Sequence, residues 1–237
     1  MKIGILGTGI VGRTLGSKLL ETGDDVMYGT RDTVRTLARN EPDAYGNPPF
    51  SEWVKQHPNV TLGTFQEAAS YGELVMNATA GVASLEALVL AGNEHLREKI
   101  LIDIANPLDF SRGFPPSLAV CNTDSLGEQI QKAFPEARVV KALNTMNCAV
   151  MVNPGLVIGD HNVFLSGNDL DAKAEVSKHL IDWFGWKPEN IIDLGDIETS
   201  RGTEMLLPIW LRLYGVIQGP FNFHIAVGPK PYKQRLK

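Results

Sequence analysis

The chain has 237 residues, of which 43% are hydrophobic and 21% charged, a balance typical of a globular protein with one large domain or one domain and a small lobe. Its net charge of -5 gives no general attraction to nucleic acid or to an anionic membrane surface. No apolar stretch reaches the length of about 20 residues that a membrane span requires. Cys121 and Cys148 stand outside any C-x-x-C pattern, which indicates neither a disulfide framework nor a metal site and favours a cytoplasmic protein with reduced thiols.

The first strong signal is a glycine-rich turn between a predicted strand at 2–6 and a predicted helix that continues to about residue 22. The turn comprises Gly7, Thr8, Gly9, Ile10, Val11 and Gly12. In this fingerprint Gly7 permits the tight turn, Gly9 lets the backbone approach a pyrophosphate, and Gly12 allows the helix to pack closely on the strand. The pyrophosphate lies at the helix N-terminus, where backbone N–H groups and the helix dipole attract an anion. The motif therefore predicts a dinucleotide-binding site.

Strands and helices alternate along the following part of the chain. The apolar patterns predict strands at 25–28, 59–62, 73–78, 99–104 and 138–143, and helices at 33–40, 64–71, 84–90 and 125–133. Thr64 and Glu67 have the spacing of a capping box at the start of one of these helices. The proline-rich segment 41–58 predicts an irregular insertion with one helical turn around Trp53. The alternation indicates a mostly parallel sheet, and such sheets bind ligands at the carboxyl ends of their strands.

The rest of the chain predicts a strand at 162–166, a helix at 170–184, a strand at 190–194 and an apolar helix from 199 to about 219. A helix with so much apolar surface needs something to pack on, so it closes the core, forms a dimer interface, or does both. We therefore expect an α/β protein with a Rossmann-type, doubly wound sheet. Its dinucleotide-binding domain spans 1–145, and a small C-terminal lobe at 146–237 continues the sheet and supplies the contact of a homodimer.

The end of the second strand distinguishes NADP from NAD. NAD-specific folds place a carboxylate there to accept hydrogen bonds from the ribose 2′-hydroxyl. This chain instead has Thr30 and Arg31, which can both donate to a 2′-phosphate, and Arg35 lies one helical turn further on the same face. Asp32 has the distance from the glycines expected of an NAD-binding carboxylate, but we expect it to cap the following helix or to face solvent. The sequence thus favours NADP.

The motifs together resemble a known family, the NADP oxidoreductases that act with the deazaflavin coenzyme F420. The N-terminal half of this family is similar to pyrroline-5-carboxylate reductases and to the reductase domains of membrane ferric reductases. The resemblance covers nearly the whole chain. Its marks are the glycine turn, the Gly29-Thr30-Arg31 segment, Asp103-Ile104-Ala105-Asn106-Pro107, Val140-Lys141-Ala142-Leu143-Asn144-Thr145, and Arg201 followed by an apolar helix with Glu204 and Pro208.

The resemblance implies hydride transfer between NADP(H) and coenzyme F420 or a flavin as second substrate. Two stacked rings can pass hydride directly, so the protein binds and orients them, and the sequence shows no catalytic acid-base pair and no metal-ligand cluster. An imine or keto-acid reductase and a non-catalytic NADP-binding redox sensor are the alternatives. By analogy, residues 8–11 contact the pyrophosphate, residues 30, 31 and 35 the 2′-phosphate, and two turns the nicotinamide. These turns contain Thr79 and Ala80, and Ala142 and Asn144.

Other polar residues permit more than one interpretation. Lys141 and Asn144 are candidates for substrate contact at a strand end, although Lys141 is equally explained as a surface lysine. Asp103 and Asn106 can simply hold their loop by hydrogen bonds to the backbone. The insertion at 41–58 and the basic segment 229–237 depart from the archaeal members of the family, and the latter could attract an acidic ligand or partner.

Overall fold

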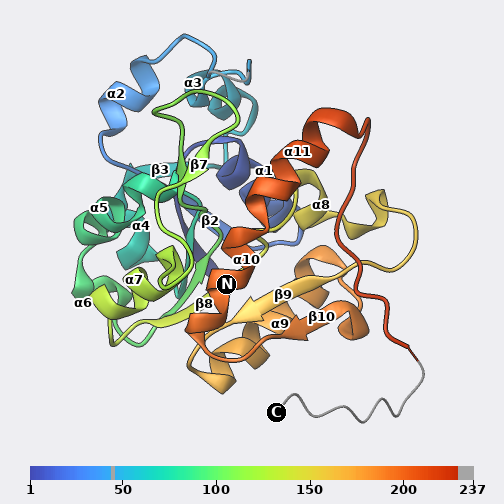
Figure 1. Ribbon diagram of the computed structural model, residues 1–237. Coiled ribbons are helices and arrows are strands. Elements are labelled where there is room, and N and C mark those ends of the chain that lie inside the picture. Colours follow the sequence, from blue (N-terminus) through green and yellow to red (C-terminus); the bar gives the residue numbers. More distant parts are fainter. Residues whose placement is uncertain (44–45, 229–237) are drawn as a thin grey trace.

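A single eight-stranded sheet organises the computed structural model, which describes residues 1–43 and 46–228 (Figure 1). The strand order is β10-β9-β8-β5-β4-β1-β2-β3, and all neighbours pair in parallel except β8 and β9. The predicted Rossmann-type, mostly parallel sheet is confirmed. The strands are β1 (Lys2–Leu6), β2 (Asp25–Thr30), β3 (Thr61–Thr64), β4 (Leu74–Asn77), β5 (Ile100–Asp103), β8 (Arg138–Ala142), β9 (Val163–Ser166) and β10 (Ile191–Asp193).

Helices cover both faces of the sheet because its inner strands are buried on both sides. One face packs against α1 (Ile10–Glu21), α8 (Cys148–Val152) and α9 (Leu170–Phe184), and the other against α4 (Phe65–Tyr71), α5 (Gly81–Ala91) and α7 (Leu126–Ala133). Successive side chains of a strand enter opposite clusters, as Leu74 and Val75 show. The remaining helices are α2 (Thr33–Ala38), α3 (Phe50–Trp53), α6 (Asn93–Leu96), α10 (Ser200–Met205) and α11 (Leu207–Val216).

The structure differs from the sequence prediction in the C-terminal lobe and in the segment after β5. The expected single apolar helix is divided into α10 and α11 at Leu206, two residues before Pro208, which lies in the first turn of α11. Proline is tolerated there because the first-turn N–H groups have no partner within the helix. A short ribbon of β6 (Leu108–Asp109) and β7 (Ser117–Leu118) also follows β5 and was not expected. The division into domains at residue 145 stays a prediction, since one sheet runs through both parts.

Two predicted helix caps are present. Thr64 and Glu67 form a capping box at the start of α4, with the Thr64 hydroxyl accepting from the Glu67 backbone and the Glu67 carboxylate accepting from the Thr64 backbone. Asp32 caps α2 by accepting a hydrogen bond from the Arg35 backbone N–H at 2.9 Å. Asp32 therefore stabilises the start of the helix that follows β2.

Among the described residues, no helix has the length and apolar character needed to cross a membrane.

An ion pair between β8 and α9 gives the fold a predictable pH dependence. The Arg138 Nε and Nη2 atoms donate to the Asp169 carboxylate at 2.7 and 3.2 Å, and Asp169 also accepts from the Ala172 backbone as the N-cap of α9. These bonds, with that from Arg138 first, lower the pKa of Asp169 to about 2. Because the folded-state pKa lies below the ordinary value, the stabilisation is present above about pH 4 and is lost as the pH falls through about 2.

We therefore expect Asp169→Asn to lose less of its thermal stability than the parent protein between pH 5 and pH 2.5. Asparagine still caps α9, so the helix start is retained while the titrating carboxylate is removed. The measurement is the midpoint of thermal unfolding by circular dichroism at both pH values. An equal loss in both proteins would contradict a contribution from Asp169.

Candidate functional site

The glycine turn lies at the carboxyl end of β1, in the middle of the sheet. Gly7 has a φ of +115°, and a Cβ atom there would lie 2.6 Å from the carbonyl oxygen of Ala78. A Cβ on Gly12 would collide with the carbonyl oxygen of Gly7. A Cβ on Gly9, in contrast, would meet no described atom within 4 Å. The fold itself requires glycine at 7 and 12, whereas Gly9 borders open space.

The start of α1 fits an anion. Gly9 is its N-cap, no side chain caps it, and its first turn contains no acidic residue. The backbone N–H groups of a helix start favour negative charge, and Ile10 and Val11 supply such groups here. Thr8 is half-buried and Ile10 exposed beside them. The open space at Gly9 and the uncapped helix therefore suit the pyrophosphate of a dinucleotide, and residues 7–12 are the ones that would hold it.

The side chains predicted to bind a 2′-phosphate lie at the end of β2 and on α2. The Thr30 and Thr36 hydroxyls share a hydrogen bond of 2.8 Å. Arg31 Nη2 donates to Glu86 on α5 at 2.7 Å, and both side chains are more than half exposed. An exposed pair of this kind contributes only about 0–1 kcal/mol, so Arg31 can exchange its partner at little cost. Arg35 is exposed on α2, whereas Arg31 lies outside this helix, before its N-cap Asp32.

The described residues of the insertion lie beside the glycine turn, a position that the sequence did not indicate. Residues of the insertion and of α2 enclose a pocket of about 140 Å³ with Thr8 and Gly9. Arg13 on α1 is buried and donates from Nη1 to the Pro48 carbonyl at 2.8 Å, which fastens the insertion to the fingerprint helix. Phe50 of α3 packs on Tyr28 with 5.4 Å between ring centres. The insertion therefore bounds the space next to the predicted pyrophosphate site.

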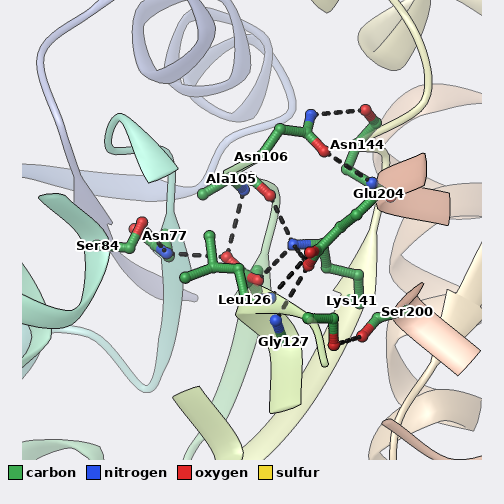
Figure 2. A network of polar contacts seen from close by, with 12 residues as sticks. Asn77, Ser84, Ala105, Asn106, Leu126, Gly127, Lys141, Asn144, Ser200 and Glu204 are labelled. Atoms are coloured by element: carbon green, nitrogen blue, oxygen red, sulfur yellow. Dashed lines mark hydrogen bonds and ion pairs between the residues drawn. The ribbon is translucent and has the colours of Figure 1, made fainter. Parts of the chain in front are cut away.

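A buried charge network lies behind the carboxyl ends of β4, β5 and β8 (Figure 2). The Lys141 ammonium is 2.8 Å from Asp103 Oδ2 and 2.8 Å from Glu204 Oε1, and it also donates to the Ala105 carbonyl. At most 1% of each of these charged side chains is exposed. Burial lowers the pKa of Lys141, but the two carboxylates outweigh it and raise that pKa overall, so the lysine is protonated.

The network continues into the loops at the sheet edge. Asp103 Oδ1 accepts from Asn77 Nδ2 at 2.8 Å, and Asn77 Oδ1 accepts from the Thr79 hydroxyl at 2.7 Å. Asn106 donates to the Asn144 carbonyl at 2.8 Å, and the Asn144 amide donates back to Asn106 Oδ1 at 3.0 Å. The loops after β4, β5 and β8 are thus fixed to one another.

The chain is similar in sequence and in fold to known reductases. The family of NADP oxidoreductases described as coenzyme F420-dependent matches residues 2–107. A solved structure from Arthrobacter sp. FB24, provisionally named an F420-dependent NADP reductase, is 56% identical and has a TM-score of 0.90. The alignment covers 96% of this chain and 100% of that one. The chain belongs to this family.

The chain also matches parts of more distantly related proteins. The rat metalloreductase STEAP3 is 29% identical over 88% of this chain, which spans 38% of that protein. The F420-dependent NADP reductase of Methanocaldococcus jannaschii is 30% identical over 51% of this chain and 52% of its own. An imine reductase from Aspergillus terreus shares the fold, with a TM-score of 0.59 at 15% identity over 91% of this chain and 62% of that one. The chain thus spans about two fifths to one half of the two curated relatives. The prediction of an NADP-dependent oxidoreductase is confirmed at the level of the family.

The structure of this F420-dependent NADP oxidoreductase family member corrects the prediction for Lys141. This side chain neither faces a substrate nor lies on the surface, because it is buried in ion pairs with Asp103 and Glu204. Asn144 lies at the predicted sheet edge, but its amide is engaged by Asn106, and the Ala142 side chain is fully buried. Contacts from these two positions to a ligand would therefore come mainly from the backbone.

The remaining predicted positions lie at the same edge of the sheet. Thr79 and Ala80 directly precede α5, next to the glycine turn, because β4 pairs with β1. The assignment of all these residues to NADP stays a prediction. The sequence analysis did not identify Glu204 as the partner of Lys141, nor Asn77 as the residue that connects Asp103 with Thr79. A charge inside a buried strand was the available signal, since such a charge requires a partner.

Proposed function

We propose that this protein transfers hydride between NADP(H) and a flavin-like or deazaflavin acceptor, coenzyme F420 or a flavin. The observation that carries the proposal is the uncapped start of α1 with open space at Gly9, placed where a doubly wound sheet receives a dinucleotide. The 56% identity to a protein provisionally named an F420-dependent NADP reductase supports the choice of acceptor. A cytoplasmic location is part of the same proposal.

The described side chains suit a protein that binds and orients its substrates. When bound, NADPH supplies the hydride itself, so no nucleophile from the protein is needed. The polar side chains at the sheet edge are engaged with one another, as in the pairs Asn77 with Thr79 and Asn106 with Asn144. Such mutual bonds fix the loops before a ligand arrives, and preorganisation of this kind lowers the entropic cost of bringing two rings together.

The imine or keto-acid reductase alternative requires a different C-terminal part. It predicts a large helical domain that completes the substrate site. Residues 170–216 instead form α9, β10, α10 and α11, of which β10 extends the sheet. The similarity to imine reductases supports the shared fold alone. We therefore place this alternative second.

Stopped-flow oxidation of NADPH tests the acceptor. The protein is mixed with NADPH and, in separate runs, with coenzyme F420, FMN, a ferric chelate and a cyclic imine. We expect rapid oxidation with F420 or FMN and slow oxidation with the imine. Reaction with the imine alone would favour the alternative. Binding of NADPH without oxidation by any acceptor would favour a non-catalytic redox sensor.

We also propose a homodimer formed through α11. Leu207 and Leu211 face the body of the protein, whereas Ile209, Tyr214 and Val216 are 53%, 56% and 76% exposed. Exposed apolar side chains on one helix favour association with another surface. We expect the double variant Ile209→Asp and Val216→Asp to sediment as a monomer, and the parent protein as a dimer.

A matched control separates the effect of this surface from a general effect of added charge. Val89 on α5 is 67% exposed and apolar, so Val89→Asp should leave the dimer intact. Analytical ultracentrifugation at micromolar concentration measures the mass of each protein. A monomeric parent protein would refute the dimer.

A further inference from the structure

The Lys141 network places three charged side chains in the interior of the protein. Asp103, Lys141 and Glu204 are all buried, and their formal charges sum to -1. Moving charged side chains out of water costs free energy. Their mutual attraction offsets this cost only when their geometry is good and further hydrogen bonds are present. Apolar side chains of similar size often give an equally stable core. We therefore look for the role of this network in the parts of the protein to which its hydrogen bonds connect.

One branch of the network leads to the loop before α5. Asp103 Oδ1 accepts from Asn77 Nδ2, and Asn77 Oδ1 in turn accepts from the Thr79 hydroxyl at 2.7 Å and the Thr79 N–H at 3.3 Å. In Figure 2 Asn77 lies beside Ser84, and its bond to Asp103 points toward the centre of the network, where Lys141 lies. The position of Thr79 is thus set by a continuous series of bonds from β8 through β5 to β4.

A second branch holds the loop after β5. Lys141 donates to the Ala105 carbonyl, and Asp103 Oδ1 accepts from the Ala105 N–H at 3.3 Å, so both sides of this residue are held. Asn106 follows directly and is paired with Asn144 in the loop after β8. The three loops at this edge are thus connected, directly or through neighbouring residues, to one ammonium group.

The third branch connects these loops to the C-terminal helices. Glu204 on α10 accepts from the Leu126 N–H at 2.8 Å and from the Gly127 N–H at 3.0 Å, at the start of α7. The positive end of a helix stabilises a carboxylate, which compensates the excess negative charge. Displacing α10 would therefore disturb Lys141 and, through it, Thr79 and Ala105.

We propose that Lys141 is a positioning residue for the nicotinamide end of bound NADP(H), acting through Asp103 and Asn77 on the loop at Thr79 and through Ala105 on the loop after β5. The inference rests on the proposed use of NADP(H) and adds to it a residue that lies outside contact with the cofactor. Glu204 extends the same control to α10.

The test compares two ligands that differ at one end. NADPH carries the nicotinamide, whereas adenosine 2′,5′-bisphosphate carries only the adenosine and its phosphates. Lys141→Met leaves two buried carboxylates without a cation, so a second variant combines Lys141→Met, Asp103→Asn and Glu204→Gln and removes all three charges together. Calorimetry measures both affinities, and stopped flow measures NADPH oxidation.

We expect the triple variant to bind adenosine 2′,5′-bisphosphate like the parent protein and NADPH about tenfold more weakly, as for the loss of one good polar contact. Hydride transfer should slow by about 10²-fold, the effect of a small displacement of reacting groups. Lys99→Met is the control. Lys99 directly precedes β5, and it also donates to backbone carbonyls, those of Ala69 and Gly72. Both affinities should be unchanged in that variant.

Hydrogen exchange of the parent protein gives a readout that needs no variant. NADPH should slow exchange in segments 77–81 and 103–106, and adenosine 2′,5′-bisphosphate should leave it unchanged. Equal losses of both affinities, parent-like NADPH affinity in the triple variant, or no difference between the ligands in exchange would each overturn the proposal. If the parent protein binds NADPH but transfers hydride to no acceptor, the affinities of the variants still decide the role of Lys141 and the exchange still locates the nicotinamide, while the proposed reaction fails separately.

Discussion

The Gly9→Ala variant should fold like the parent protein and bind NADPH about 10²-fold more weakly. Gly9 has φ -74° and ψ 179°, values that alanine adopts without strain, and the added Cβ would meet no described atom within 4 Å. Alanine is a poorer N-cap by about 0.5–1 kcal/mol, but it stabilises by a similar amount through a less flexible unfolded chain. The two effects offset each other, so the fold is retained.

The expected loss of affinity has a separate cause. The methyl group that Gly9→Ala introduces would occupy the space through which a pyrophosphate approaches the start of α1. Hydrogen bonds to a charged group contribute about 1.5–3 kcal/mol each, so displacing one or two of them lowers the affinity by about 10²-fold. Titration of NADPH fluorescence measures the affinity, and urea denaturation measures the free energy of unfolding.

Gly12→Ala is the matched contrast within the same motif. Its Cβ would collide with the carbonyl oxygen of Gly7, and α1 would have to move away from β1. Overpacking of this kind costs about 1–3 kcal/mol, so this variant should lose stability as well as binding. NADPH binding by Gly9→Ala at the parent affinity would mean that the pyrophosphate does not lie at this turn.

The features that the sequence predicted well depend on neighbouring residues. The glycine turn, the capping box of Thr64 and Glu67, and the Asp32 cap each involve residues a few positions apart, so local geometry determines them. The helix at 170–184 was also predicted at its observed bounds from the pattern of its residues alone. Such signals need no knowledge of the tertiary fold.

The features that were missed depend on partners far along the chain. Lys141 follows apolar residues in a strand, and nothing near it in the sequence names Glu204 as the group that holds it. The packing of the insertion on Arg13 and Tyr28 was hidden in the same way, since prolines indicate irregular backbone but not the surface it covers. The antiparallel direction of β9 likewise depends on the path of the chain from 143 to 162. Long-range pairing sets all three, and a local pattern cannot report it.

Arg31→Ala should lower the preference for NADPH over NADH by about 10²-fold, because the variant loses a charge-assisted bond to the 2′-phosphate of NADPH but nothing that NADH uses. The measurement is the ratio of kcat/KM values for the two coenzymes with one acceptor. Arg97 is the matched control: it also forms an exposed ion pair, with Glu136, and it lies next to the start of β5. Arg97→Ala should leave the ratio unchanged.

The ion pair of Arg31 with Glu86 predicts that a substitution of Glu86 strengthens the binding of NADPH, the opposite of the effect of Arg31→Ala. Glu86→Gln weakens the competing attraction within the protein, so the Arg31 guanidinium is more available to a phosphate. Since an exposed pair is worth at most about 1 kcal/mol, KM for NADPH should fall by no more than about fivefold, and less at high ionic strength.

An unchanged coenzyme preference in Arg31→Ala would refute the assignment of Arg31 to the 2′-phosphate. A loss confined to Arg35→Ala would move the phosphate site from the end of β2 onto α2, because Arg35 lies on α2 whereas Arg31 precedes the N-cap of that helix.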